Sequence, residues 1–214
     1  MIVTFCLQED SGPVSAIERA RLTVASVRKA MPSARIVQLT NETFQGLAEV
    51  DDVYRHPRGK LDFIEWAFSG LIEVCRRHLN VLQIATDVLV LRDVEYQFEG
   101  DFDIAACRYP ARTRTDGAFC GDVNFIRPLG VGFLRRALAI YRGLPERDGW
   151  EGGQTAFLRA HDERQGKRFR ELDFERYCRT PETPSEEVGD AALVHFRGPR
   201  KEWMPAYARR LGIS

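Results

Sequence analysis

Residues 81–93 read Val-Leu-Gln-Ile-Ala-Thr-Asp-Val-Leu-Val-Leu-Arg-Asp, and this stretch decides the fold class of the chain. A mainly apolar run at 81–85 is followed at once by a second apolar run at 88–91, with the carboxylate of Asp87 between them. Short runs of this kind are typical of strands buried on both faces of a sheet. We therefore expect a buried strand that delivers Asp87 to its carboxyl end.

The segments before this stretch alternate between strand and helix. Strands are predicted at 2–7, 35–40 and 52–55, and helices at about 16–30 and 60–78. Ser15 and Glu18 have the spacing of a capping box, which predicts that the first helix begins after Ser15. This alternation predicts an α/β fold, in which a mostly parallel sheet is flanked by helices.

The second half of the sequence predicts a small antiparallel extension of that sheet. Strand-like runs occur at 102–107, 122–127 and 191–196, and a helix is predicted at about 131–142. The glycine-rich stretch 149–153 predicts a break before a shorter helix. Since no linker interrupts the pattern, we expect one domain over residues 1–214.

The composition excludes some partners and suggests a compartment. The chain carries 31 basic and 31 acidic side chains, so no overall field favours nucleic acid or an anionic membrane. No apolar run is long enough to span a membrane. The five cysteines are odd in number and scattered, which predicts reduced thiols in a cytoplasmic protein.

Three segments carry candidate chemistry, and each also has a plain structural explanation. Asp87 ends a strand, where ligands bind in open α/β sheets, and a carboxylate there can hold Mg²⁺ or Mn²⁺ against a diphosphate. It would equally suit a turn between strands. His195 and Lys201 follow the last strand and suit a metal and a phosphate, although His195 would also suit a hydrogen-bonded strand end. The third segment is the glycine-rich turn before Gln154.

Taken together, these segments resemble the glycogenin-like family of retaining glycosyltransferases, which have the GT-A fold. The family's Leu-Asp-Ala-Asp-Thr-Leu-Val-Leu is similar to residues 84–91. Its late motif His-Phe-x-Gly-x-x-Lys-Pro-Trp is similar to residues 195–203, where Glu202 replaces the proline. Its Asn-Ala-Gly-Val strand, ending in Lys-Pro, is similar to residues 120–128.

The sequence also departs from the family pattern at three positions. Ala85 stands where the family has the first Asp of Asp-x-Asp, and Gly153 stands where it has the Asp of Asp-Gln. Cys120 replaces an Asn. The chain thus resembles a divergent member with an incomplete metal motif, and Asp122, a carboxylate absent from the family pattern, is our candidate for taking over a lost role.

The resemblance implies a hexosyltransferase-like enzyme that takes a sugar from a nucleotide-diphosphate sugar, a UDP-sugar by analogy, and retains its configuration. Mn²⁺ or Mg²⁺ would be held by Asp87 and His195, and the catalytic candidates are Gln154, Asp122 and Lys60. The residues implied to bind the donor are Thr4, Phe5 and Cys6 at the base, with Lys60, Asp87, Gly198 and Lys201 at the sugar and diphosphate.

The sequence is also compatible with two other functions. A nucleotidyltransferase usually has a basic, glycine-rich loop after the first strand, whereas residues 8–13 are acidic and contain little glycine. A non-catalytic nucleotide-sugar-binding protein or scaffold is supported by Ala85 and Gly153. The acceptor is not identified. Arg108, Arg112 and Arg114 would suit an anionic glycan or nucleic acid, or simply a solvated loop.

Overall fold

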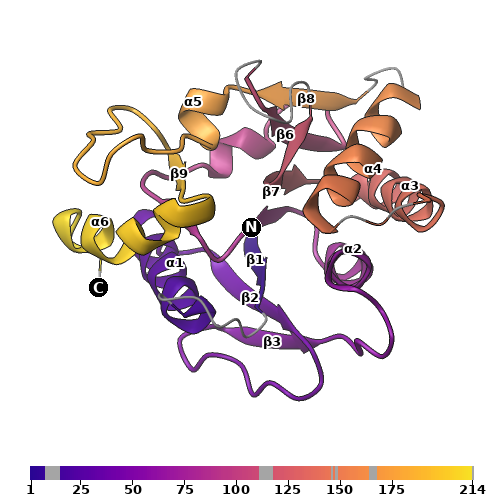
Figure 1. Cartoon of the computed structure of the whole chain (residues 1–214), viewed down its shortest axis with the longest axis horizontal. Coiled ribbons are helices and arrows are strands. Elements are labelled where there is room, and N and C mark those ends of the chain that lie inside the picture. The colour runs from indigo at the N-terminus through magenta and orange to yellow at the C-terminus, as the bar shows by residue number, and fades with distance from the viewer. Residues whose placement is uncertain (8–14, 111–117, 146, 148, 164–167, 214) are drawn as a thin grey trace.

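The structure is a computed structural model that describes residues 1–7, 15–110, 118–145, 147, 149–163 and 168–213. A seven-stranded sheet runs through the molecule in the order β3-β2-β1-β4-β7-β6-β8 (Figure 1). Strand β7 runs antiparallel to both of its neighbours, and every other described pairing in this sheet is parallel. The strands are β1 (Ile2–Cys6), β2 (Arg35–Thr40), β3 (Asp52–Arg55), β4 (Val81–Ile84), β6 (Ile104–Arg108), β7 (Phe119–Ile126) and β8 (Phe169–Leu172).

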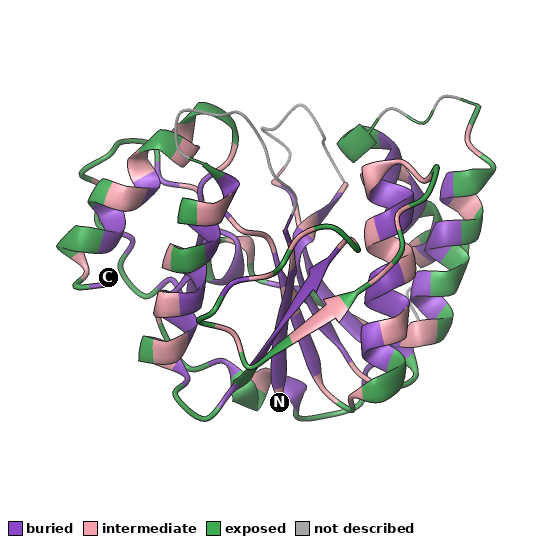
Figure 2. Cartoon of the chain, turned by 90° about the horizontal axis from the view of Figure 1, so that it is seen from below, coloured by how far each residue is buried: buried purple, intermediate pink, exposed green. Residues whose placement is uncertain are grey.

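Helices cover both faces of this sheet (Figures 1 and 2). On one side lie α1 (Ala16–Ala30) and α6 (Met204–Arg210), and on the other α2 (Phe63–Arg77), α3 (Gly130–Arg142) and α4 (Gly149–Glu163). The shorter elements are α5 (Phe174–Tyr177) and the 3₁₀ turns η1 (Glu95–Phe98) and η2 (Gly198–Trp203). The predicted α/β class, with a mostly parallel sheet between helices, is confirmed.

The sheet is buried on both faces because successive side chains of a strand point in opposite directions. Val3 packs with the α1 side of the core and its neighbour Ile2 with the side covered by α2, α3 and α4. Ala105 and Ala106 divide between the two sides in the same way. This two-sided burial explains why the strands read as nearly continuous apolar runs, and each fully buried Val, Ile, Leu or Phe contributes roughly 1.5–3 kcal/mol.

A second, two-stranded sheet joins the middle of the chain to its end. Strand β5 (Val88–Val90) pairs antiparallel with β9 (Leu193–His195), with Val88 opposite His195. The pairing continues as the Phe196 N–H donates to the Asp87 carbonyl over 2.9 Å. Asp87 and His195 are therefore brought together by backbone pairing, although they lie far apart in the sequence.

Helix α1 holds β5 in place through two buried hydroxyls. Thr23 Oγ1 lies 3.0 Å from the Thr86 carbonyl oxygen and 2.9 Å from that of Val88. Ser26 Oγ accepts a hydrogen bond from the Val90 N–H over 2.9 Å. The helix itself begins as predicted, because Ser15 Oγ accepts from the Glu18 N–H. Buried polar contacts thus fix the turn that carries Asp87.

One predicted boundary was wrong, and packing explains why. The glycine-rich stretch 149–153 is the first turn of α4 and not a break. A Cβ on Gly153 would lie 3.1 Å from Ile64 Cγ2, and one on Gly152 would lie 3.1 Å from Tyr141 Cε2. The glycines therefore allow α4 to approach α2 and α3 closely, which the local sequence does not reveal.

Smaller differences concern other element boundaries. Strand β7 begins at Phe119, ahead of the predicted 122–127, so Cys120 lies inside it. Strand β8, helices α5 and α6 and the turn η2 were not predicted. Residues 8–13, Arg112 and Arg114, on which sequence interpretations rested, lie outside the described residues. All five cysteines are free, and in the described part of the chain no helix has the length and apolar character of a membrane span.

The close approach at the start of α3 gives a first prediction. A Cβ on Gly130 would lie 2.5 Å from the Asp103 carbonyl oxygen and 2.9 Å from Ile126 Cγ2. Gly130→Ala should therefore lower the free energy of unfolding by about 1–3 kcal/mol. Gly132→Ala, two residues further along the same helix and with open space around its Cβ, should raise it by roughly 0.5–1 kcal/mol. Urea unfolding of both variants measures this, and a shift of the same sign in both would contradict the packing described.

Candidate functional site

A cavity of about 700 Å³ opens at the edge of the sheet where β1 and β4 end. Because β7 is antiparallel, its amino end reaches this same edge. The cavity is accordingly lined by Cys6 at the end of β1, by residues 85–87 after β4, and by Gly121 and Asp122 near the start of β7. Ligand sites of open α/β sheets lie at this edge.

Charged side chains converge on Asp87 at the cavity wall. Asp87 Oδ1 lies 3.2 Å from His195 Nε2, and Asp87 Oδ2 lies 3.1 Å from Lys201 Nζ. Asp122 Oδ2 lies 3.8 Å from the same His195 nitrogen. Asp87, Asp122 and His195 are buried, whereas the Lys201 side chain is 39% exposed. Lys201 is therefore a positive group at this wall that a ligand can reach.

The proximity of these groups shifts their pKa values in different directions. Burial raises the pKa of Asp87, but the charges of His195 and Lys201 outweigh burial and hold it below its ordinary value. Burial also raises the pKa of Asp122, and there the shift is upward because His195 opposes burial only in part. Burial lowers the pKa of His195, but the two carboxylates outweigh it and raise that pKa well above its usual range. Asp87 is thus the carboxylate that stays ionised most firmly.

Unpaired hydrogen-bond acceptors line the cavity as well. Asn124 donates through Nδ2 to Gln83 Oε1 and to the Gly121 carbonyl, but its own Oδ1 is buried with no hydrogen-bond partner among the described residues. Gln154 Oε1 is likewise buried and has no hydrogen-bond partner among the described residues. Buried acceptors without partners cost stability, roughly 1–3 kcal/mol each, unless a ligand or water donates to them. Asn124 and Gln154 are therefore lining residues whose hydrogen-bonding capacity the described residues do not use in full.

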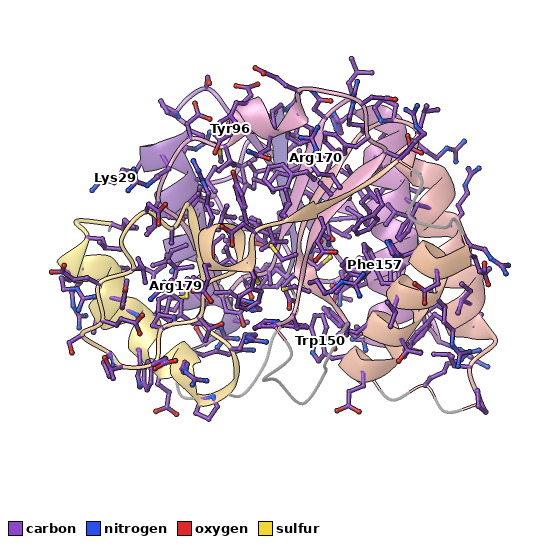
Figure 3. The ribbon with its side chains drawn as sticks, turned by 90° about the horizontal axis from the view of Figure 1, so that it is seen from above. Lys29, Tyr96, Trp150, Phe157, Arg170 and Arg179 are labelled. Atoms are coloured by element: carbon purple, nitrogen blue, oxygen red, sulfur yellow. The ribbon has the colours of Figure 1, made fainter. Side chains whose placement is uncertain are left out.

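The remaining wall is apolar and comes from α2, α3 and α4. Trp150 stands on the first turn of α4 with 54% of its surface exposed, and its ring meets Phe63 edge-on at 5.7 Å between centroids (Figure 3). Behind this pair the cavity is lined by Ile64, Ala67, Phe68, Leu71, Leu134 and Phe157. The cavity therefore combines an ionic wall with an apolar one, as small-molecule sites commonly do.

Most residues singled out in the sequence line this cavity, but Thr4, Phe5, Lys60 and Arg108 do not. Those that do are Cys6, Asp87, Asp122, Gln154, His195, Gly198 and Lys201. Thr4 and Phe5 lie buried in the sheet, and Lys60 is exposed in the segment before α2; none of the three is among the lining residues. Arg108 pairs with Glu171 of β8 at 3.1 Å. The roles given to these residues remain predictions.

Sequence reasoning missed several lining residues. Gln83 and Asn124 are polar residues inside apolar strands, a signal that could have identified them. Arg19 is a buried arginine on α1, and Arg197 and Tyr109 follow strands that reach the cavity edge. These three residues reach the cavity because of the order of the strands in the sheet, which a local sequence pattern does not reveal.

Comparison with known proteins gives structural likeness without sequence likeness. No family model and no curated protein matches the chain. A glycosyltransferase involved in glycosylation of the major capsid of PBCV-1 superposes with a TM-score of 0.64 at 13% identity, covering 96% of this chain and 98% of that one. The galactosyltransferase LgtC, solved with donor and acceptor sugar analogs, gives 0.63 at 14%, covering 99% and 94%. The glycosyltransferase GlyE of Streptococcus pneumoniae TIGR4 gives 0.67 at 14%, covering 97% of this chain and 60% of its own.

The chain has the GT-A fold. This confirms the fold predicted from the sequence, and at these identities the likeness establishes the fold alone. The superposition covers 98% and 94% of the lengths of two of these structures. The sheet and helices of this chain therefore match nearly the whole of each of those two proteins.

The anchoring of Asp87 can be tested through Thr23. Thr23→Val keeps the side-chain shape but removes the hydroxyl shared by the Thr86 and Val88 carbonyls, so the free energy of unfolding should fall by about 1–3 kcal/mol. Thr40→Val is a matched control, because Thr40 is equally buried but makes a single long contact of 3.4 Å to the Leu7 carbonyl. Urea unfolding should show the smaller loss in Thr40→Val. Equal losses would mean that Thr23 does not anchor the turn.

Proposed function

We propose that this GT-A chain is a glycosyltransferase that moves a sugar from a nucleotide-diphosphate sugar, with UDP as the nucleotide, to an acceptor hydroxyl. The observation that supports this proposal is the lining of the cavity. Lys201 supplies a positive group suited to a diphosphate, beside Asp87 and His195. Asn124 Oδ1 and Gln154 Oε1 supply unpaired acceptors suited to sugar hydroxyls.

Lys201 would act on the leaving group. When the bond between the sugar and the diphosphate breaks, the bonding electrons stay on the diphosphate, and negative charge develops on its oxygens. An ammonium already placed at the cavity wall stabilises that charge without having to reorganise. Asp87 would hold the lysine in position, since its Oδ2 lies 3.1 Å from Lys201 Nζ.

Asn124, Gln154 and Asp122 would act on the sugar. Departure of the diphosphate leaves an oxocarbenium-like sugar, the species that arises in glycoside hydrolysis. Asn124 and Gln154 would orient it by accepting hydrogen bonds from its hydroxyls. Asp122 is the nearby carboxylate that would take the proton from the attacking acceptor hydroxyl, and its raised pKa suits a group that accepts a proton.

The described residues do not fit the Mn²⁺ or Mg²⁺ ion that the resemblance implies at Asp87 and His195. These ions prefer an oxygen-rich set of ligands. Ala85 offers no carboxylate, and a cation at Asp87 would compete with the Lys201 ammonium already 3.1 Å away. The group of potential ligands that does converge in the described part of the chain is Cys120, Cys178 and His195, which is rich in sulfur. No step of the proposed transfer therefore involves such an ion.

Removal of Lys201 tests the proposed function. Lys201→Ala should weaken UDP binding by roughly 10- to 100-fold, because a hydrogen bond to a charged group is worth about 1.5–3 kcal/mol, and it should leave uridine binding nearly unchanged. Arg209→Ala, which removes an exposed charge from α6, is the control. Calorimetric titration measures both ligands. An equal loss for uridine would make Lys201 structural, and no binding of UDP by the parent protein would refute the proposal and leave a scaffold function.

The variant Ala85→Asp tests whether the protein binds UDP without a metal ion. Ala85 lines the cavity, and its N–H donates to the Asp122 carbonyl over 2.9 Å, so Ala85→Asp would place a third carboxylate beside Asp87 and Asp122. Without Mn²⁺, UDP binding should fall about tenfold, since like charges repel the diphosphate. With Mn²⁺ added, the variant should recover, because three carboxylates then offer the oxygen-rich set that this ion prefers. The parent protein, desalted and then titrated with and without Mn²⁺, should show no difference, and a strong Mn²⁺ dependence there would contradict this account.

A further inference from the structure

A cluster of buried cysteines lies directly behind His195, and the proposed transfer reaction does not use it. Cys120 of β7 and Cys178, the residue that follows α5, are both fully buried, with their sulfur atoms 2.9 Å apart. His195 Nδ1 lies 3.6 Å from Cys178 Sγ and 3.9 Å from Cys120 Sγ. Cys107 of β6 adds a third thiol next to Cys178. Two thiols and an imidazole nitrogen therefore converge inside the protein.

The spacing of these atoms is close to that of a zinc site. The two sulfurs and Nδ1 all lie within 4.8 Å of one another. Zinc binds thiolate at ~2.3 Å and imidazole at ~2.0–2.1 Å, so the ligand atoms of a tetrahedral site lie roughly 3.4–3.8 Å apart. The two nitrogen–sulfur distances are already near this range. Only the sulfur–sulfur distance would have to open, by just under ~1 Å on the same geometry.

The other nitrogen of His195 provides a second, independent observation. A histidine that binds a metal through one ring nitrogen usually donates its other N–H to a carboxylate, which fixes the orientation of the ring. His195 Nε2 lies 3.2 Å from Asp87 Oδ1, a buried oxygen that accepts no hydrogen bond of ordinary geometry from the described residues. Zinc on Nδ1 would require the ring to turn slightly, and that turn would direct Nε2–H towards this oxygen. Carboxylate, imidazole and thiols thus follow one another in the order that zinc sites use.

The donor atoms and their surroundings favour zinc over harder ions. Thiolates are soft ligands that select zinc or copper(I) over Mg²⁺ and Mn²⁺. Each thiol releases its proton as it binds, so two thiolates and Zn²⁺ cancel in charge, which suits the buried position. Complete burial of Cys120, Cys178 and His195 indicates a structural ion and not one that meets substrate.

We propose that Cys120, Cys178 and Nδ1 of His195 form a buried Zn²⁺ site that joins the two sheets behind the cavity. Cys120 belongs to the large sheet and His195 to the small one, so the ion would link β7 to β9 directly. It would fix the ring of His195 and, through it, Asp87 at the cavity wall. The site does not depend on glycosyl transfer, because none of its ligands requires a donor to be bound.

The test is the metal content of the purified chain. Protein produced with zinc in the medium and passed through gel filtration should retain about one zinc per chain, as structural sites do. Protein produced with Co²⁺ instead should show the absorbance that arises from charge transfer between thiolate and cobalt. Cys120→Ala and Cys178→Ala should each lower the retained zinc at least tenfold. Cys75→Ala, which removes a buried thiol of α2 that lies in an apolar cluster, should retain it.

The parent protein alone can overturn the proposal, even if the cysteine variants fail to fold. The proposal fails if the parent retains no zinc and shows no thiolate–cobalt band. It also fails if cobalt binds without that band, which would place the ion on the carboxylates, or if peptide mass analysis finds Cys120 and Cys178 joined in a disulfide. UDP titration of the same samples separates the two proposals. A parent protein that retains zinc but binds no UDP would count against glycosyl transfer only.

Discussion

The pairing of β5 with β9 is the constraint on which the candidate site depends. Val88 lies opposite His195 in this two-stranded sheet, and the Phe196 N–H donates to the Asp87 carbonyl. Backbone hydrogen bonds therefore place a carboxylate from the middle of the chain beside an imidazole from its end. Lys201 joins them because η2 follows β9 almost at once. If this pairing slipped by one residue, alternate side chains would exchange faces and the ionic wall would be lost.

The same pairing explains why α1 carries buried polar residues. Thr23 and Ser26 lie on the face of α1 that packs against the sheet, where apolar residues are the rule. Their hydroxyls form hydrogen bonds with backbone groups of the turn and of β5. Stability of the core and geometry of the site are thus served by the same two side chains. Two polar residues in the sequence of α1 thus help to determine the position of Asp87.

The sequence predicted the layers of the fold well and the contacts between distant segments poorly. Apolar runs and helical periodicity predicted β1, β2, β3, β4, α1 and α3 at nearly their observed bounds, since these patterns report burial directly. The glycines at 149–153 were misinterpreted because their role lies in the approach of α4 to Ile64 and Tyr141, which are remote in the sequence. Asp87, His195 and Lys201 were singled out by a family resemblance and by their place after strands, and the structure brings them together. Asn124 stands out locally as a polar residue inside an apolar strand, but its role, like that of Cys178, depends on neighbours that are remote in the sequence.

The central claim is that one cavity holds a nucleotide-diphosphate sugar with its diphosphate at Lys201 and its sugar at Asn124 and Gln154. A crystal structure of the chain with UDP and with intact UDP-sugars tests it most directly. The account predicts diphosphate oxygens within hydrogen-bonding distance of Lys201 Nζ, and sugar hydroxyls that donate to Asn124 Oδ1 and Gln154 Oε1. Ligand bound elsewhere, or a diphosphate turned away from Lys201 in the occupied cavity, would contradict it.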